Sequence, residues 1–148
     1  MTLQHLLGIE LPLIQAPMAG VQGSALALAV CGAGALGSLP CAMLDAAALQ
    51  REVAALAAGT SRPWNLNFFC HTPPTPDAAR DAAWRALLAP YYGELGLPAP
   101  VASSGPLRRP FDTETATLLD AVRPPVVSFH FGLPAPDLLA HVKSWGAL

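Results

Sequence analysis

Short apolar runs separated by longer amphipathic stretches set the pattern of this chain. Each run has the length and the apolar content of a strand that is buried on both faces. The predicted strands are residues 13–17, 35–39, 64–69 and 126–131. The stretches between the runs place apolar residues at helical spacing, often after a residue that can cap a helix. The predicted helices are residues 25–31, 45–59, 77–89, 112–122 and 137–144, with Ser24 and Asp45 as N-caps of the first two.

The alternation of strands and helices predicts an α/β fold, because right-handed crossovers place successive strands in one parallel sheet. A doubly wound open sheet and a (β/α)8 barrel both fit this order. Polar side chains near the carboxyl ends of the strands favour the barrel, whose interior receives such groups. A complete barrel takes about 250 residues, so we expect a partial (β/α)8 TIM barrel of about the first four βα units. It would form one domain over residues 1–148, with an irregular insertion at about 90–110 and a fifth strand beginning at 145–148.

Polar side chains share one face of three predicted strands. Side chains alternate between the two faces of a strand, so Ser128 and His130 lie together, as do Asn65 and Asn67. Gln15 takes the corresponding place on the first strand. Each of these residues alone is typical of a core group that hydrogen-bonds neighbouring backbone. Together they predict a site at the carboxyl ends of the strands.

Composition narrows the class of protein. A formal charge of −2 with eight basic residues argues against nucleic acid or an anionic membrane as a partner. Apolar residues make up 53% of the chain, but no apolar run approaches the roughly twenty residues of a membrane span. The first residues lack the basic start of a secretory signal, so we expect a cytoplasmic protein. Cys31, Cys41 and Cys70 have no metal or redox spacing and are interpreted as reduced packing residues.

Three apparent signals of a functional site have simpler interpretations. Residues 32–37 match the G-x-G-x-x-G dinucleotide fingerprint, but they follow a helix and precede a strand, the reverse of the order that phosphate binding needs. We interpret these glycines as a helix stop and a close approach of helix to sheet. His5, His71 and His141 are scattered and form no cluster with Cys or Asp, so no metal site is predicted. Ser103 follows no strand and therefore does not indicate a nucleophile elbow.

Four segments in order resemble the nitronate monooxygenase family, formerly called 2-nitropropane dioxygenase. They are Leu-Ile-Gln-Ala-Pro-Met-Ala-Gly at 13–20, Gly-Ala-Gly-Ala-Leu-Gly-Ser at 32–38, Asn-Leu-Asn-Phe-Phe at 65–69 and Val-Ser-Phe-His-Phe-Gly-Leu-Pro at 127–134. The resemblance implies an FMN-containing (β/α)8 barrel that oxidises alkyl nitronates, such as propionate 3-nitronate, with molecular oxygen. It spans nearly the whole chain and corresponds to the amino-terminal half of that barrel.

The resemblance also implies roles for individual residues. FMN would be contacted by the backbone around Ala16, Pro17 and Met18 and by the side chain of Asn67. The substrate would be lined by Gln15, Ser128 and His130, with His130 as the catalytic residue. The family's second histidine and its glycine-rich phosphate loops belong to the other half of the barrel, after later strands. The chain is therefore expected to need that missing half, or a homo-oligomer, and to bind FMN weakly alone.

Two other functions fit the same residues. The first is a flavin reductase that uses NAD(P)H, of the quinone reductase or enoyl-acyl-carrier reductase kind, because the opening barrel motif is shared more widely than the reaction. The second is a non-catalytic fragment that packs against a complementary chain. The insertion at about 90–110 is compatible both with a lid over the pocket and with an inert surface excursion.

Overall fold

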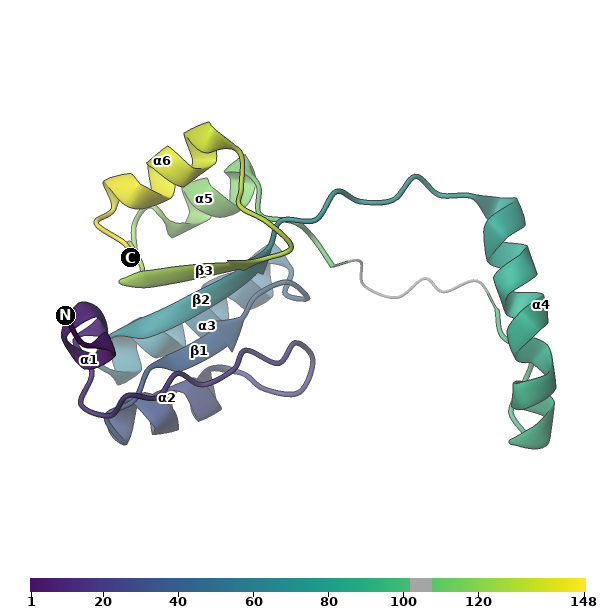
Figure 1. Cartoon of the computed structure of the whole chain (residues 1–148), viewed down its shortest axis with the longest axis horizontal. Coiled ribbons are helices and arrows are strands. Elements are labelled where there is room, and N and C mark those ends of the chain that lie inside the picture. The colour runs from purple at the N-terminus through teal and green to yellow at the C-terminus, as the bar shows by residue number, and fades with distance from the viewer. Residues whose placement is uncertain (102–107) are drawn as a thin grey trace. The chain divides into compact units, whose positions relative to one another are not determined.

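A three-stranded parallel sheet forms the centre of the larger unit of the protein. The computed structural model describes residues 1–101 and 108–148. The strands are β1 (Gly37–Pro40), β2 (Trp64–Phe69) and β3 (Val126–His130), in the order β1-β2-β3 (Figure 1). Leu39 pairs with Leu66, and Asn67 pairs with Ser128. This arrangement confirms the α/β class and the parallel sheet.

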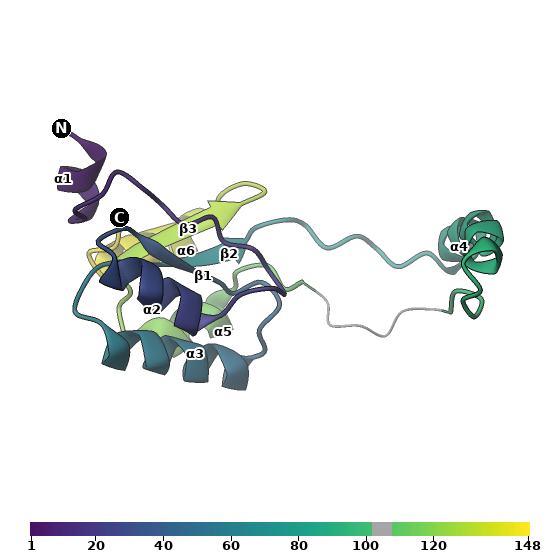
Figure 2. The ribbon, with the colours of Figure 1, turned by 90° about the horizontal axis from the view of Figure 1, so that it is seen from below.

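Helices alternate with the strands along the chain. They are α1 (Leu3–Leu7), α2 (Ser24–Gly32), α3 (Ala46–Gly59), α4 (Ala78–Glu94), α5 (Thr113–Leu119) and α6 (Pro136–Ser144). Figure 2 shows α2, α3 and α5 together on one side of the sheet. The main core lies under this helical layer, where Leu66 and Val127 of the sheet belong to one buried cluster with Leu56 of α3 and Val142 of α6. The opposite face of the sheet is therefore free of these helices.

Three aspartates cap helices; the sequence pattern predicts Asp45 as a cap and places Asp77 and Asp112 at the first position of their helices. Asp45, Asp77 and Asp112 each accept hydrogen bonds from backbone N–H groups in the first turn of α3, α4 and α5. The prediction of Ser24 as the N-cap of α2 is wrong, because Ser24 is already the first helical residue. Its N–H donates instead to the carboxylate of Glu52 on α3, at 2.7 Å. A neighbouring helix therefore caps α2.

The prediction of a strand at 13–17 is wrong, because these residues form no regular strand. They do lie beside β1, as expected. A single parallel bridge joins Ile14 to Leu36, with N–H to O distances of 2.9 Å from Gln15 to Leu36 and 3.0 Å from Leu36 to Leu13. Pro12 and Pro17 lack the N–H that a longer ladder would need. Within the described residues, the sheet consequently contains three strands, and the Ile14 bridge takes the place of the fourth.

The other edge of the sheet pairs with the last residue of the chain. Leu148 donates its N–H to the carbonyl of Pro125, and its own carbonyl accepts the N–H of Val127, both at 3.1 Å. In a parallel ladder, one residue hydrogen-bonds to the two residues that flank its partner, and Leu148 does so with Val126 as the partner. Leu148 thus lies where a further strand was expected to begin.

The described residues 73–101 belong to a second compact unit. Its helix α4 continues to Glu94. The prediction of an irregular insertion at about 90–110 is therefore wrong for residues 90–94. Pro90 lies inside the helix. None of the helix residues is buried, and Trp84 is 59% exposed. Residues 102–107 of the predicted insertion lie outside the described residues.

Other boundaries differ by a few residues. The short helix α1 was not predicted; Thr2 caps its start, and Gly8 ends it with a φ of 67°. The helix predicted at 112–122 stops at Leu119, ahead of Arg123, whose φ is 49°, and of two prolines. Within the described residues, no helix is both long enough and apolar enough to cross a bilayer.

Candidate functional site

A row of hydrogen-bonded polar side chains crosses the face of the sheet that points away from the helical layer. The carboxamide nitrogen of Asn65 donates to the hydroxyl of Ser38 at 3.1 Å and to that of Ser128 at 2.9 Å. Ser38, Asn65 and Asn67 are buried. The alternation of side chains along β1, β2 and β3 aligns these groups, because the parallel register places Ser38 beside Asn65 and Asn67 beside Ser128.

Asn67 continues the row to His130 at the carboxyl end of β3. Its Nδ2 lies 2.9 Å from Ser128 Oγ and 3.0 Å from His130 Nδ1, and its Oδ1 lies 3.2 Å from the same ring nitrogen. Either tautomer of the ring can therefore pair with the amide. No described group hydrogen-bonds His130 Nε2, and the residue is exposed. The ring is held at Nδ1 and presents Nε2 at the edge of the sheet.

Two glutamines extend the row at its β1 end. Gln15 pairs with the backbone of Ser38 through both amide atoms, with Nε2 to O at 3.2 Å and N to Oε1 at 3.1 Å. Gln22 Nε2 donates to the carbonyls of Ala16 and Ser38, at 3.1 and 3.4 Å. The structure thus brings together Gln15, Asn67, Ser128 and His130, which the sequence predicts to share one site.

Ala16, Pro17 and Met18 lie in the irregular segment between the Ile14 bridge and α2. Because this segment runs parallel to β1, the three residues follow Gln15 toward the carboxyl end of the sheet. Met18 is 51% exposed, and Ala16 is also exposed. The bond from Gln22 to the Ala16 carbonyl helps to hold the segment in place. Its backbone is available to contact a ligand.

Four rings gather at the carboxyl edge beside His130. The Phe69 ring packs edge-to-face on Phe131 with centroids 4.9 Å apart, and on His71 and His130 at 6.2 and 6.0 Å. Phe131 has a φ of 65°, a left-handed conformation that is rare for a bulky residue, and Gly132 follows at 109°. Backbone strain of this kind clusters at functional sites.

Sequence reasoning missed three members of this arrangement. Ser38 was overlooked because it is one polar residue in a glycine-rich apolar run, and Gln22 because it lies in a turn. His71 was judged to be an isolated histidine. It stands two residues after Phe69, so the alternation that selects Asn65 and Asn67 would also have selected it.

Hydrogen-bonding capacity remains unused on this face. Gln22 Oε1, Asn65 Oδ1 and His71 Nδ1 are buried without a partner among the described residues. Buried polar atoms nearly always find a partner, so these atoms indicate places where a ligand or water completes the site. The polar row itself contains no carboxylate. It therefore offers neutral donors and acceptors without fixing a negative charge.

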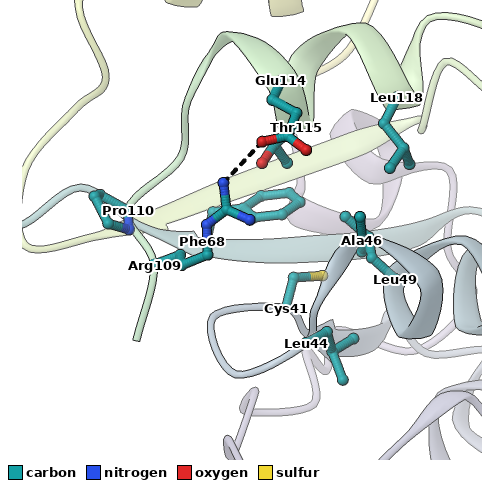
Figure 3. Close-up of a pocket in the computed structure, with 10 residues that line it drawn as sticks. All are labelled: Cys41, Leu44, Ala46, Leu49, Phe68, Arg109, Pro110, Glu114, Thr115 and Leu118. Carbon is teal, nitrogen blue, oxygen red and sulfur yellow. Dashed lines mark hydrogen bonds and ion pairs between the residues drawn. The ribbon is translucent and has the colours of Figure 1, made fainter. Parts of the chain in front are cut away.

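A separate hollow lies on the helical side of the sheet, between β2, α3 and α5. Figure 3 shows Arg109 at its rim, ion-paired with Glu114 at 3.0 Å. Burial raises the pKa of the Cys41 thiol in its wall, which keeps this thiol protonated and unreactive. Desolvation likewise raises the pKa of Cys31 and Cys70. The hollow has no connection to the polar row, and we assign it no chemistry.

The remaining polar clusters of the larger unit are structural. Asp120 Oδ1 lies 2.6 Å from His141 Nε2 and accepts from Trp145 Nε1 at 2.9 Å, which ties the end of α5 to α6. These bonds, first that of Trp145 and then that of His141, lower the pKa of Asp120. No group of three or more potential metal ligands occurs within residues 1–101 and 108–148.

Comparison with known proteins gives a consistent match. The nitronate monooxygenase of Paraburkholderia phytofirmans is 43% identical over 149 residues, covering 95% of this chain and 39% of that protein. The nitronate monooxygenase of Pseudomonas aeruginosa is 44% identical over 148 residues, covering 96% and 41%. The chain thus spans about two fifths of the length of these curated relatives.

Solved structures agree with the sequence comparison. The nitroalkane oxidase of Streptomyces ansochromogenes superimposes with a TM-score of 0.75 at 33% identity, over 95% of this chain and 39% of that one. A FabK mutant from Thermotoga maritima gives a TM-score of 0.64 at 20% identity, over 98% and 36%, which is a likeness of fold alone. The family model for nitronate monooxygenase matches residues 1–148. Because this match covers the whole chain, the chain belongs to the nitronate monooxygenase family.

Proposed function

We propose that these 148 residues form one wall of an FMN site at which alkyl nitronates are oxidised by molecular oxygen. The observation that supports this function is the row of neutral polar side chains that ends in His130 at the carboxyl edge of the sheet. In β/α barrels, this is the edge at which active sites are built.

The residues present fit the flavin ring. FMN supplies the electron transfer when it is bound, and its ring carries both donor and acceptor edges. Asn65 Oδ1 and Gln22 Oε1 are buried acceptors on the polar face that find no partner in the part of the chain that the structure describes. Asn67 and the exposed backbone of 16–18 would provide further contacts, as the family resemblance implies. Uncharged amides suit both edges of the ring without placing a fixed charge beside it.

His130 would hold the substrate. A nitronate is the deprotonated form of a nitroalkane, so its oxidation needs no strong base. The exposed Nε2 of His130 can donate to a nitronate oxygen either as neutral imidazole or as imidazolium. Asn67 orients the ring by contacting Nδ1, and Ser128 in turn fixes Asn67. Gln15 and Ser128 would line the substrate side of the same face.

The rest of the site would come from residues outside these 148. Relatives are about two and a half times as long as the matched segment, since it covers 39% and 41% of their length. Leu148 already pairs with the free edge of β3, which is suited to a further parallel strand. We propose that either the missing barrel half or a second copy of the chain completes the flavin site.

A chimeric protein tests this function. Residues 1–148 would replace the matching amino-terminal segment of the Pseudomonas aeruginosa relative, and oxygen uptake would be measured with propionate 3-nitronate. We expect FMN retention and nitronate-dependent uptake, lowered at least about 100-fold in His130→Ala but unchanged in His5→Ala. A folded chimera that retains FMN and consumes no oxygen with nitronates would contradict the proposal.

The same chimera separates the oxidase from a flavin reductase. Under anaerobic conditions, nitronate should bleach the flavin absorbance while NADH and NADPH should leave it unchanged. Rapid bleaching by a nicotinamide without a response to nitronate would favour the reductase.

A further inference from the structure

His71 has a half-buried ring with an unused nitrogen at the carboxyl edge of the sheet. His71 follows β2, and the residue as a whole is half-buried. Its Nδ1 is buried and has no hydrogen-bond partner among the described residues. A buried nitrogen without a partner destabilises the fold, so its natural complement is a group that comes from elsewhere.

The surroundings of His71 match those of His130. Its ring centroid lies 6.2 Å from that of Phe69 and 6.3 Å from that of Phe131. The corresponding distances for His130 are 6.0 and 6.2 Å. Both imidazoles therefore contact the same pair of aromatic rings, which pack on each other at 4.9 Å. None of the described residues places a carboxylate in hydrogen-bond contact with either ring.

Phe131 adds an apolar surface to this pair of imidazoles. It is 67% exposed, and its φ of 65° holds the ring beside Phe69 at a cost in backbone strain. Leu133, two residues later, is 68% exposed. Polar nitrogens beside exposed apolar side chains form a surface suited to a small ligand with one charged end and one alkyl end.

We propose that His71 is a second nitronate-binding residue: a turn of its half-buried ring would direct Nδ1–H to one nitronate oxygen while His130 donates to the other. The alkyl group would lie against Phe131. A nitronate divides its negative charge between two oxygens, so two separate N–H donors suit it better than one. This inference rests on the proposed function, because it assumes that the nitronate binds beside His130.

Imidazole resonances of the 148-residue chain provide the test. Two-bond ¹H–¹⁵N correlation spectra of labelled protein would be recorded during titration with ethyl nitronate, with propionate as an anion of similar size. We expect saturable shifts at His71 and His130 with the nitronate, smaller shifts with propionate, and none at His5 or His141. Shifts at His130 alone would overturn the inference and leave the proposed function standing. The absence of shifts at both rings would also overturn the inference, whereas the proposed function, which needs FMN and the rest of the barrel, is overturned only by the chimera.

Matched variants test the same point without relying on assignment. His71→Phe keeps the aromatic packing but removes the donor, and should weaken ethyl nitronate binding about 10-fold, as the loss of one hydrogen bond to an anion predicts. His71→Asn keeps an N–H near the Nδ1 position and should weaken binding by no more than about 3-fold. Equal binding by wild type and His71→Phe would overturn the role of His71, even where His130→Phe abolishes binding.

Discussion

Ser128 has a central position among the polar side chains of the site. Its hydroxyl accepts from the carboxamides of both Asn65 and Asn67, each at 2.9 Å. Removing this acceptor leaves two buried donors with fewer partners. We therefore expect Ser128→Ala to lower the free energy of unfolding by about 1–2 kcal/mol, measured by urea denaturation. Ser144→Ala is the control, because that exposed hydroxyl should contribute less than about 0.5 kcal/mol. Equal losses in the two variants would contradict this account.

At the scale of single residues, the two-residue period of a strand predicts which side chains share a face. It correctly groups Asn65 with Asn67 and Ser128 with His130. It does not predict which partners they find, because the pairing of Asn67 with Ser128 depends on register between strands that are 61 residues apart. The roles of these residues toward FMN and substrate remain predictions.

At the scale of elements, Gly37 shows what the glycine motif does. A Cβ on Gly37 would lie 2.1 Å from the Ala27 carbonyl and 2.8 Å from Cys31 Sγ, so α2 packs directly on the backbone of β1. We expect Gly37→Ala to destabilise the protein by at least about 2 kcal/mol in urea denaturation. Gly32→Ala is the matched control, since a Cβ there meets nothing within 4 Å and a helical alanine is favourable. Similar losses at both glycines would refute the close-packing interpretation.

Glu52 links two helices in a pH-dependent manner. Hydrogen bonds from the Ser24 side chain and backbone lower the pKa of Glu52 below its ordinary value of 4.5. Because the folded-state pKa is the lower one, the stabilisation is complete above the unfolded pKa and is lost as pH falls through the folded pKa. Glu52→Gln should therefore cost about 0.5–1 kcal/mol at pH 7 and almost nothing near pH 2.

Urea denaturation at both pH values measures this effect. Glu94→Gln is the control for net charge, because Glu94 is at the end of α4 and caps no helix start. A cost of Glu52→Gln that persisted unchanged at low pH would show that the charge of Glu52 is not involved.

Sequence patterns predict the strands and helices well where local signals agree with packing. The Asp45 cap of α3 and the run of β2 are confirmed, and α4 and α5 begin within a residue of the predicted starts. The prediction of Ser24 as a cap is wrong because the competing acceptor comes from Glu52, 28 residues away. Pro90 is a helix breaker by propensity, yet α4 continues through it. The capping of α2 therefore depends on a contact between residues that lie far apart in the sequence.

At the scale of the whole molecule, the two edges of the sheet have few backbone hydrogen bonds to a neighbouring segment. Among the described residues, one edge is paired through the Ile14 bridge and the Gln15 side chain, and the other through Leu148. Exposed strand edges promote association between chains. The exposed apolar residues Leu13, Ile14 and Met18 add to this tendency. We expect the chain alone to self-associate at high concentration, as sedimentation velocity would show, and a fully monomeric solution at millimolar concentration would contradict this.

The isolated chain should bind FMN weakly or not at all, because the contacts proposed for its residues are all to the flavin ring and none is to the phosphate. Barrels generally bind phosphate after strands seven and eight, beyond the strands present here. Fluorescence titration should therefore give a dissociation constant no tighter than about 0.1 mM, and riboflavin should bind as well as FMN. Riboflavin is the informative comparison, since it lacks only the phosphate. Tighter binding of FMN than of riboflavin, or co-purification of stoichiometric flavin with a monomer, would show that these 148 residues hold the phosphate after all.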